Sequence, residues 1–139
     1  MAQAVREVMT KNPVMLQAND TLVEAARRMR DADVGNVLVM DAGRLKGIVT
    51  DRDITIRGVA NGKDPNRSTL SEVCSPQLVT IPADKPVDDA VKLMREKSVR
   101  RLPVVDGDTP VGVVSIGDLA VEKDSKSALA DISSAEPNR

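Results

Sequence analysis

The chain has 139 residues, with 20 Lys and Arg against 21 Asp and Glu, a formal net charge of −1 and 41% hydrophobic residues; this length suits one compact unit or two very small ones. It contains no His, Phe, Tyr or Trp and a single Cys, which argues against histidine catalysis, metal binding by histidine, an internal disulfide and a cysteine-rich zinc site. The balanced charge and the missing aromatic rings argue against nucleic-acid binding, because there is neither a basic surface nor a platform for stacking bases.

The chain shows no signal for export or membrane insertion. Its N-terminus has no apolar stretch that resembles a signal peptide, and no apolar run approaches the roughly 18 residues of a membrane span. We therefore expect a cytoplasmic protein, with neither nucleic acids nor membranes among its partners.

The first helix is predicted from a capping box formed by Thr21 and Glu24. Apolar residues then follow at the i, i+3, i+4 and i+7 spacing of a buried helical face. They are Leu22, Ala25, Ala26 and Met29. The arginines of the same segment, Arg27, Arg28 and Arg30, lie near acidic residues, so we interpret them as a solvated face and not as a basic binding patch.

Strand-like runs flank this helix. An apolar stretch at residues 14–16 precedes it, and runs at 37–40 and 45–49 follow it, with turn residues at 41–44 between them. A second short helix is expected over residues 51–57. The first half therefore reads β-α-β-β-α.

The second half repeats the first at an offset of 65 positions without a gap. The identical pairs include Gly and Asp as well as apolar residues, which favours true duplication over a shared packing pattern. The pairs are Glu7/Glu72, Val8/Val73, Val14/Val79, Ala18/Ala83, Ala25/Ala90, Met29/Met94, Arg30/Arg95, Val34/Val99, Val39/Val104, Asp41/Asp106, Gly47/Gly112, Val49/Val114 and Asp53/Asp118.

The same elements are expected at the shifted positions. Strand-like runs occupy residues 79–81, 102–105 and 111–114, and the Asp106-Gly107 step favours a tight hairpin between the last two. A helix is predicted to begin with Pro86 and to bury Val87, Ala90, Val91 and Met94. A second short helix is expected over residues 116–122.

These elements predict an α/β (α+β) fold of two β-α-β-β-α repeats. We assign residues 4–59 to the first repeat, 60–69 to a polar, turn-rich linker, 70–122 to the second repeat and 123–139 to a disordered tail with little to bury. A half of about 55 residues is marginal by itself, so we expect the two repeats to pack together as one folding unit.

The most specific motif, Gly-x-x-Thr/Ser-x-x-Asp, stands at the end of the third strand in each half. Thr50 or Ser115 closes the strand, and Asp53 or Asp118 follows three residues later on the first turn of the next helix. Such a carboxylate can accept hydrogen bonds from both hydroxyls of a ribose, while the Thr or Ser hydroxyl and the helix N–H groups suit a phosphate or sugar oxygen. Ordinary N-capping would place the same residue types there, so capping is the structural alternative.

The two motifs, with the stretch from Val99 to Asp106, resemble a tandem pair of cystathionine-β-synthase (CBS) domains, the Bateman module. The resemblance covers about residues 4–122. It implies two repeats that pair by their sheets into a pseudo-twofold unit with two clefts. It also implies an adenosyl ligand in these clefts, such as AMP, ADP, ATP or S-adenosylmethionine, and a disc-like homodimer that senses the ligand without catalysing a reaction.

The resemblance assigns a role to each candidate site residue. The ribose carboxylates are Asp53 and Asp118, and the hydroxyls near the ribose or phosphate are Thr50 and Ser115. The aliphatic walls around adenine are Val14, Val34, Val79 and Val99. The phosphate-binding residues are Arg100 and Arg101, although a solvated charged turn is an equal alternative for them. Pro103 is a further ligand-binding candidate.

The halves differ at the arginine pair, because Gly35 and Asn36 occupy the positions of Arg100 and Arg101. We therefore expect the two clefts to differ in affinity. Cys74 is interpreted as a small core residue in preference to a redox switch. No spacing of acidic residues demands a metal ion.

The sequence and the resemblance together predict a stand-alone, non-catalytic ligand sensor that forms a homodimer and signals to an unidentified protein partner. Ligand binding would shift the population of two arrangements that the partner distinguishes. A ligand-free structural or dimerisation scaffold is the main alternative, because intact capping motifs would look the same. An enzyme is least favoured, since no catalytic motif is visible.

Overall fold

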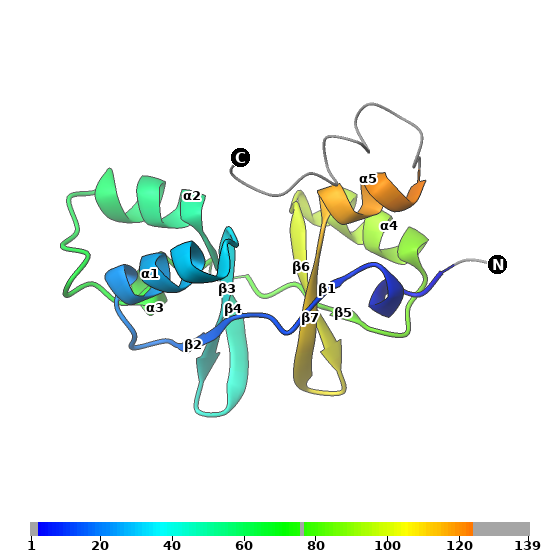
Figure 1. The fold of residues 1–139 in the computed structure, drawn as a ribbon, viewed down its shortest axis with the longest axis horizontal. Helices are drawn as coiled ribbons and strands as arrows, with labels where there is room; N and C mark the ends of the chain where they lie inside the picture. Colours follow the sequence, from blue (N-terminus) through cyan, green and yellow to red (C-terminus); the bar gives the residue numbers. More distant parts are fainter. Residues whose placement is uncertain (1–2, 76, 124–139) are drawn as a thin grey trace. The chain divides into compact units, whose positions relative to one another are not determined.

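The computed structural model describes residues 3–75 and 77–123 (Figure 1). These residues fall into two compact units. One unit holds Val14–Leu78, and the other combines the residues up to Pro13 with those from Val79 onward. We call them the β3–β4 unit and the β6–β7 unit after their central hairpins. Residues 124–139 of the predicted tail lie outside the described residues.

The β3–β4 unit contains a three-stranded sheet in the order β2-β3-β4. Strand β2 pairs parallel to β3, and β3 pairs antiparallel to β4. The elements are β2 (Met15–Gln17), α1 (Leu22–Ala32), β3 (Asn36–Asp41), β4 (Arg44–Thr50), α2 (Asp51–Asp53), the π-helix η2 (Ile54–Val59) and α3 (Leu70–Val73).

The β6–β7 unit contains a four-stranded sheet in the order β1-β7-β6-β5. Strand β5 pairs parallel to β6, while β7 pairs antiparallel to both β6 and β1. The elements are the 3-10 helix η1 (Val5–Glu7), β1 (Thr10–Lys11), β5 (Ile81–Pro82), α4 (Val87–Lys97), β6 (Arg101–Asp106), β7 (Thr109–Ser115) and α5 (Ile116–Lys123). The predicted mixed α/β fold and the order β-α-β-β-α in each half are confirmed.

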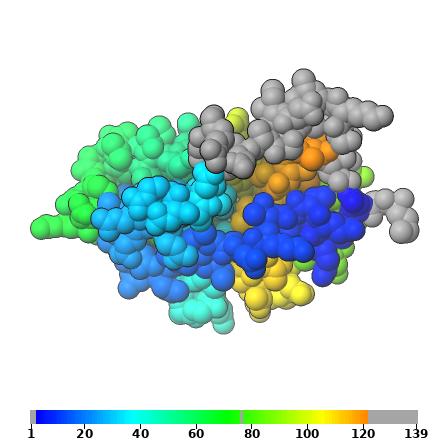
Figure 2. Space-filling view, viewed as in Figure 1, coloured from blue at the N-terminus to red at the C-terminus, as the bar shows by residue number. Residues whose placement is uncertain are grey.

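In each unit the long helix covers one face of its own sheet (Figure 1). Leu22, Ala25 and Met29 of α1 are buried in an aliphatic core with residues of β3 and β4. The prediction that Ala26 belongs to this buried face is wrong, because Ala26 is exposed to solvent. Helix α1 otherwise lies at the surface of its unit (Figure 2), and its three arginines are exposed as expected.

Helix α4 repeats this arrangement in the β6–β7 unit. Val87, Ala90 and Met94 are buried, and Val91 is half-buried. Pro86 is not the first helical residue but the N-cap, with an extended ψ of 149°. Its missing N–H costs nothing there, because the first turn of a helix leaves its N–H groups without helical partners.

The short helix predicted over residues 51–57 changes character after one turn. Only Asp51–Asp53 is α-helical, and Ile54–Val59 continues as a π-helix, with the N–H of Ala60 donating to the carbonyl of Thr55 at 2.9 Å. In this wider helix Gly58 is buried, and a Cβ at Gly58 would come within 2.9 Å of Leu22 Cδ1. A periodicity of 3.6 residues does not anticipate a π-helix.

The N-terminal segment of the chain packs in the β6–β7 unit and not with residues 14–59. Val5 is fully buried there, in the core that contains Ile81 and Val87. The N–H of Val5 donates to the carbonyl of Lys85 at 2.8 Å. Strand β1 then adds to the edge of β7.

The segment from Leu70 makes the equivalent contacts in the β3–β4 unit. Leu70 is fully buried, and its N–H donates to the carbonyl of Asp20 at 2.9 Å, while that of Ser71 donates to Ala18 at 3.0 Å. Part of the predicted linker is also ordered by this unit, since the N–H of Val23 donates to the carbonyl of Pro65 at 3.0 Å. The segment at the start of each sequence repeat therefore packs in the compact unit that is formed mainly by the other repeat.

Two-residue loops close both hairpins, as the pairing of Asp41 with Arg44 and of Asp106 with Thr109 shows. Gly107 has a φ of 62°, which glycine adopts without a steric penalty. In the first hairpin Ala42 has a φ of 52°, a left-handed conformation that Asn tolerates better than Ala.

We expect Ala42→Asn to stabilise the protein by about 0.5–1 kcal/mol, because Asn relieves part of the left-handed penalty in a turn that favours Asn-Gly. Denaturant unfolding of both proteins measures the difference. Ala60→Asn is the matched control, since Ala60 is also exposed but has a φ of −64°. An equal gain in both variants, or none in Ala42→Asn, would contradict this account of the turn.

Among the described residues, no helix combines the length and the apolar character needed to cross a bilayer.

Candidate functional site

At the end of β4, Thr50 and Asp53 form a reciprocal capping box. Asp53 Oδ2 accepts the backbone N–H of Thr50 at 2.8 Å, and the Thr50 hydroxyl accepts the N–H of Asp53 at 3.1 Å. The N–H of Asp51 donates to the carbonyl of Gly35 at 3.0 Å, which ties the turn to the residue just before β3. Both partners of the box are half-buried, so local hydrogen bonds fix their positions.

At the end of β7, Ser115 and Asp118 form the same box. Asp118 Oδ2 accepts the N–H of Ser115 at 2.9 Å, and the Ser115 hydroxyl accepts the N–H of Asp118 at 3.2 Å. The N–H of Ile116 donates to the carbonyl of Arg100 at 2.9 Å, as the equivalent bond does in the other unit. The structure thus brings together both predicted hydroxyl–carboxylate pairs, and each carboxylate uses one oxygen for capping.

The second oxygen distinguishes the two carboxylates. Arg57 Nε lies 3.9 Å from Asp53 Oδ1. Among the side chains of residues 3–75 and 77–121, none donates to or pairs with Asp118 Oδ1. Sequence reasoning missed Arg57, although an acidic and a basic residue four positions apart on one helix are a recognisable pair.

The arginine pair borders the turn of the β6–β7 unit. Arg101 pairs with Ser115 across β6 and β7, so its Cα lies beside the strand end that carries the predicted hydroxyl. Arg100 is exposed and Arg101 is half-buried. In the β3–β4 unit, Asn36 pairs with Thr50 in the same register, which confirms the alignment of the two halves at this position.

The predicted apolar residues are only partly available to a ligand. Val14 packs against the core of its own unit, and Val79 and Val99 pack against the core of theirs, each with part of its surface accessible. Val34 is half-buried at the exit of α1. These four valines keep an accessible portion from which adenine could be contacted.

Pro103 differs from these valines because it is fully buried. Its neighbours in β6, Leu102 and Val104, belong to the helix-covered core, so the alternation of a strand puts Pro103 on the opposite face of the sheet, paired with Val113. The assignment of Pro103 to ligand binding stays a prediction.

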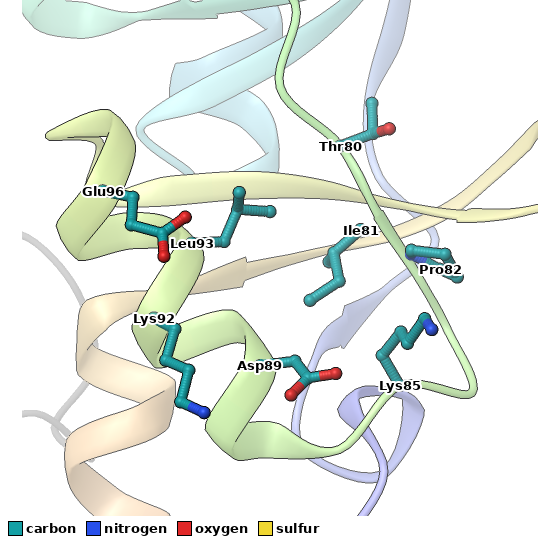
Figure 3. Close-up of a pocket in the computed structure, with 8 residues that line it drawn as sticks. All are labelled: Thr80, Ile81, Pro82, Lys85, Asp89, Lys92, Leu93 and Glu96. Atoms are coloured by element: carbon teal, nitrogen blue, oxygen red, sulfur yellow. The ribbon is translucent and has the colours of Figure 1, made fainter.

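Surface hollows of the β6–β7 unit include one of about 370 Å³, which contains none of the predicted site residues and is lined by Arg6, Glu7, Met9, Lys11, Ala83, Asp106 and Val111, and two others. One, of about 260 Å³, lies between β5 and α4 (Figure 3), below the roughly 300–1,000 Å³ of typical ligand pockets. It contains none of the predicted site residues; it is lined by Thr80, Ile81, Pro82, Lys85, Asp89, Lys92, Leu93 and Glu96. The other lies between α4 and α5 and includes Val99 of the predicted set beside Met94 and Ile116.

Cys74 is a core residue, as its interpretation from the sequence anticipates. It belongs to the buried cluster of the β3–β4 unit, and burial raises the pKa of its thiol. Its Sγ would lie 2.5 Å from a Cβ at position 47, so close packing against Cys74 favours the glycine of the first motif. Among the described residues, no three His, Cys, Asp or Glu side chains gather in a group suited to a metal ion.

Comparison with known proteins places these features in one family. The model of the CBS domain matches residues 5–58 and 70–123. The CBS domain-containing protein YhcV of Bacillus subtilis is 41% identical over 134 residues, which cover 94% of this chain and 95% of that protein.

Two solved structures share the fold. The crystal structure of Hypoxic Response Protein I with two coordinated zinc ions has a TM-score of 0.76 and 34% identity, and the match covers 85% of this chain and 97% of that one. A CBS domain pair in complex with 5′-methylthioadenosine and S-adenosyl-L-methionine has a TM-score of 0.80 and 26% identity, covering 91% of this chain and 100% of that one. With two matched domains and a duplicated strand–helix turn, this chain belongs to the CBS domain family.

Proposed function

We propose that the chain is a regulatory module that binds an adenosyl ligand at its strand–helix turns and signals by a conformational change. The observation that carries the proposal is the duplicated capping box, in which a half-buried carboxylate and a hydroxyl stand together at the end of a strand. The fold it shares with a CBS pair that binds 5′-methylthioadenosine and S-adenosyl-L-methionine supports an adenosyl compound as the ligand.

In this proposal the strand–helix turn of each unit binds the ribose of the ligand. Capping occupies Oδ2 of Asp53 and Asp118, and Oδ1 is the oxygen that would accept the ribose hydroxyls. The hydroxyls of Thr50 and Ser115 and the N–H groups of the turn would contact the ribose or a phosphate. Arg100, whose side chain is exposed, would contact a phosphate together with Arg101, and the accessible parts of the four valines would contact adenine.

The proposed role is regulatory and not catalytic, with no obligatory cofactor. We propose a cytoplasmic location, a homodimer and a further protein partner that reads the ligand-bound state. Zinc is not part of the proposal, because a chain with no His and one Cys lacks the ligands that structural zinc sites use.

A thermal-unfolding screen with AMP, ADP, ATP and S-adenosylmethionine tests the proposal. Calorimetry is suitable, since a chain without Trp or Tyr gives no useful intrinsic fluorescence. A ligand present at a hundredfold excess over its dissociation constant should add about 2.7 kcal/mol to the stability, a shift of several degrees. The ligand-induced shift should disappear in the Asp53→Ala/Asp118→Ala variant. Because this variant also loses two helix caps, its shift is measured from its own melting temperature without ligand.

A ligand-free dimerisation scaffold is the second candidate. The specific observation in its favour is that both carboxylates already cap a helix, which is a sufficient structural reason for them. Under this candidate no adenosyl compound shifts the melting temperature, and the double variant loses only the capping contribution of about 0.5–2 kcal/mol per turn.

A further inference from the structure

We propose that Arg57 restricts ligand binding at Asp53, so that the turn of the β6–β7 unit is the site of higher affinity. The proposal rests on the proposed function and deepens it by naming the occupied site and the residue that sets the difference. Arg57 acts as a specificity-determining residue, because it engages the oxygen that the ribose would need.

Both carboxylate oxygens of Asp53 have protein partners. Oδ2 accepts the N–H of Thr50 at 2.8 Å, and Oδ1 lies 3.9 Å from Arg57 Nε. The Asp53 side chain is 21% exposed and that of Arg57 is 46% exposed, so solvent screens the pair only in part. A ribose that binds Asp53 must therefore displace the guanidinium or share the oxygen with it.

The position of Arg57 follows from the helix that carries it. Arg57 stands in η2, one turn after Asp53. Its Nη1 also donates to the carbonyl of Val73 at 3.5 Å, at the end of α3. The guanidinium is thus held between a carboxylate and a backbone carbonyl, and moving it toward a ligand would break both contacts.

The turn at Asp118 has the opposite arrangement. Among the side chains that the structure describes up to residue 121, no cation pairs with Oδ1 of Asp118, and this oxygen is able to accept a ribose hydroxyl. Arg100 directly precedes β6, and its carbonyl accepts the N–H of Ile116, while Arg101 is the first residue of β6 and pairs with Ser115. In the proposed function these two arginines contact a phosphate and do not compete for the carboxylate.

The test isolates the Asp53 site by the Asp118→Ala substitution and titrates it with AMP and with S-adenosylmethionine by calorimetry. Adding Arg57→Gln should raise the affinity of this site about two- to fivefold, the range expected when a surface ion pair no longer competes. Arg52→Gln is the matched control, because it removes the same charge from the same segment at an exposed position. It should leave the affinity unchanged or lower it slightly.

An unchanged or lower affinity in Arg57→Gln would overturn the proposal, since it would mean that Arg57 is neutral or contacts the ligand. The proposal would also be overturned if Asp53→Ala removed the tighter site of the wild-type protein and Asp118→Ala retained it. The proposed function would still stand in that case. Absence of binding to the wild-type protein would remove the proposed function itself, and this inference with it.

Discussion

Val5→Asp is expected to destabilise the β6–β7 unit by at least about 4 kcal/mol, because it places an unpaired carboxylate in an aliphatic core. Val5 is fully buried among residues of the second repeat, with its N–H bonded to the carbonyl of Lys85 at 2.8 Å. No cation belongs to this buried cluster. Denaturant unfolding gives the size of the loss, and amide hydrogen exchange gives its place, which should be residues 79–123.

Arg6→Asp is the matched control for this prediction. Arg6 is the next residue of the same 3-10 helix and is exposed, so a carboxylate there should change the stability by no more than about 0.5 kcal/mol. Exchange that accelerates in residues 14–59 while residues 79–123 stay protected would show that Val5 belongs with its own repeat. That outcome would contradict the packing of the N-terminal segment in the β6–β7 unit.

Gly112→Ala is expected to cost about 3 kcal/mol through overpacking. A Cβ at this position would meet the carbonyl oxygen of Thr10 at 2.7 Å and Met9 Sδ at 2.5 Å. The methionine side chain can move, but the Thr10 carbonyl is backbone of β1, which pairs with β7 at this point. The strand pair must therefore open, and chemical denaturation should record the loss.

Gly47→Ala is the equivalent change in the β3–β4 unit and should cost less, about 1–2 kcal/mol, because the close atom is a side-chain sulfur. Cys74 Sγ would lie 2.5 Å from the new Cβ, whereas the Ser75 carbonyl would be 3.7 Å away. Adding Cys74→Ala should restore part of the loss in a double-mutant cycle. Additive effects of Gly47→Ala and Cys74→Ala would contradict the assigned contact.

Much of the fold was predictable because the elements are encoded locally. The capping box of Thr21 and Glu24 begins a helix as expected, and the hairpin favoured by the Asp106-Gly107 step closes with a tight loop. In the first half the loop is shorter than the four turn residues expected, because Asp41 and Arg44 pair as strand residues. The placement of Val5 and Leu70 was not predictable, because either repeat offers them an aliphatic core. The π-helix after Asp53 was also not predictable from the sequence, because it is accompanied by tertiary packing of Gly58 on Leu22 and no local sequence pattern indicates it.

At the candidate site, the pairing of each hydroxyl with its carboxylate was predictable, and the ligand-binding role of these residues stays a prediction. The repeated spacing identified both hydroxyl–carboxylate pairs, and the structure joins each pair by two hydrogen bonds. The state of the second carboxylate oxygen was not predictable, because it depends on where the Arg57 side chain lies. The roles of Arg100 and Arg101 in binding, like those of the capping residues, stay predictions.

The central claim is that Asp53 and Asp118 bind an adenosyl ligand as well as capping their helices. Calorimetric titration of the wild-type protein and of Asp53→Ala/Asp118→Ala with AMP and S-adenosylmethionine tests it most directly. We predict saturable binding to the wild-type protein and a loss of about ten- to a hundredfold in the double variant, because each turn loses a hydrogen bond to a charged acceptor, worth about 1.5–3 kcal/mol. Equal affinity in the two proteins, or no binding to either, would contradict the claim.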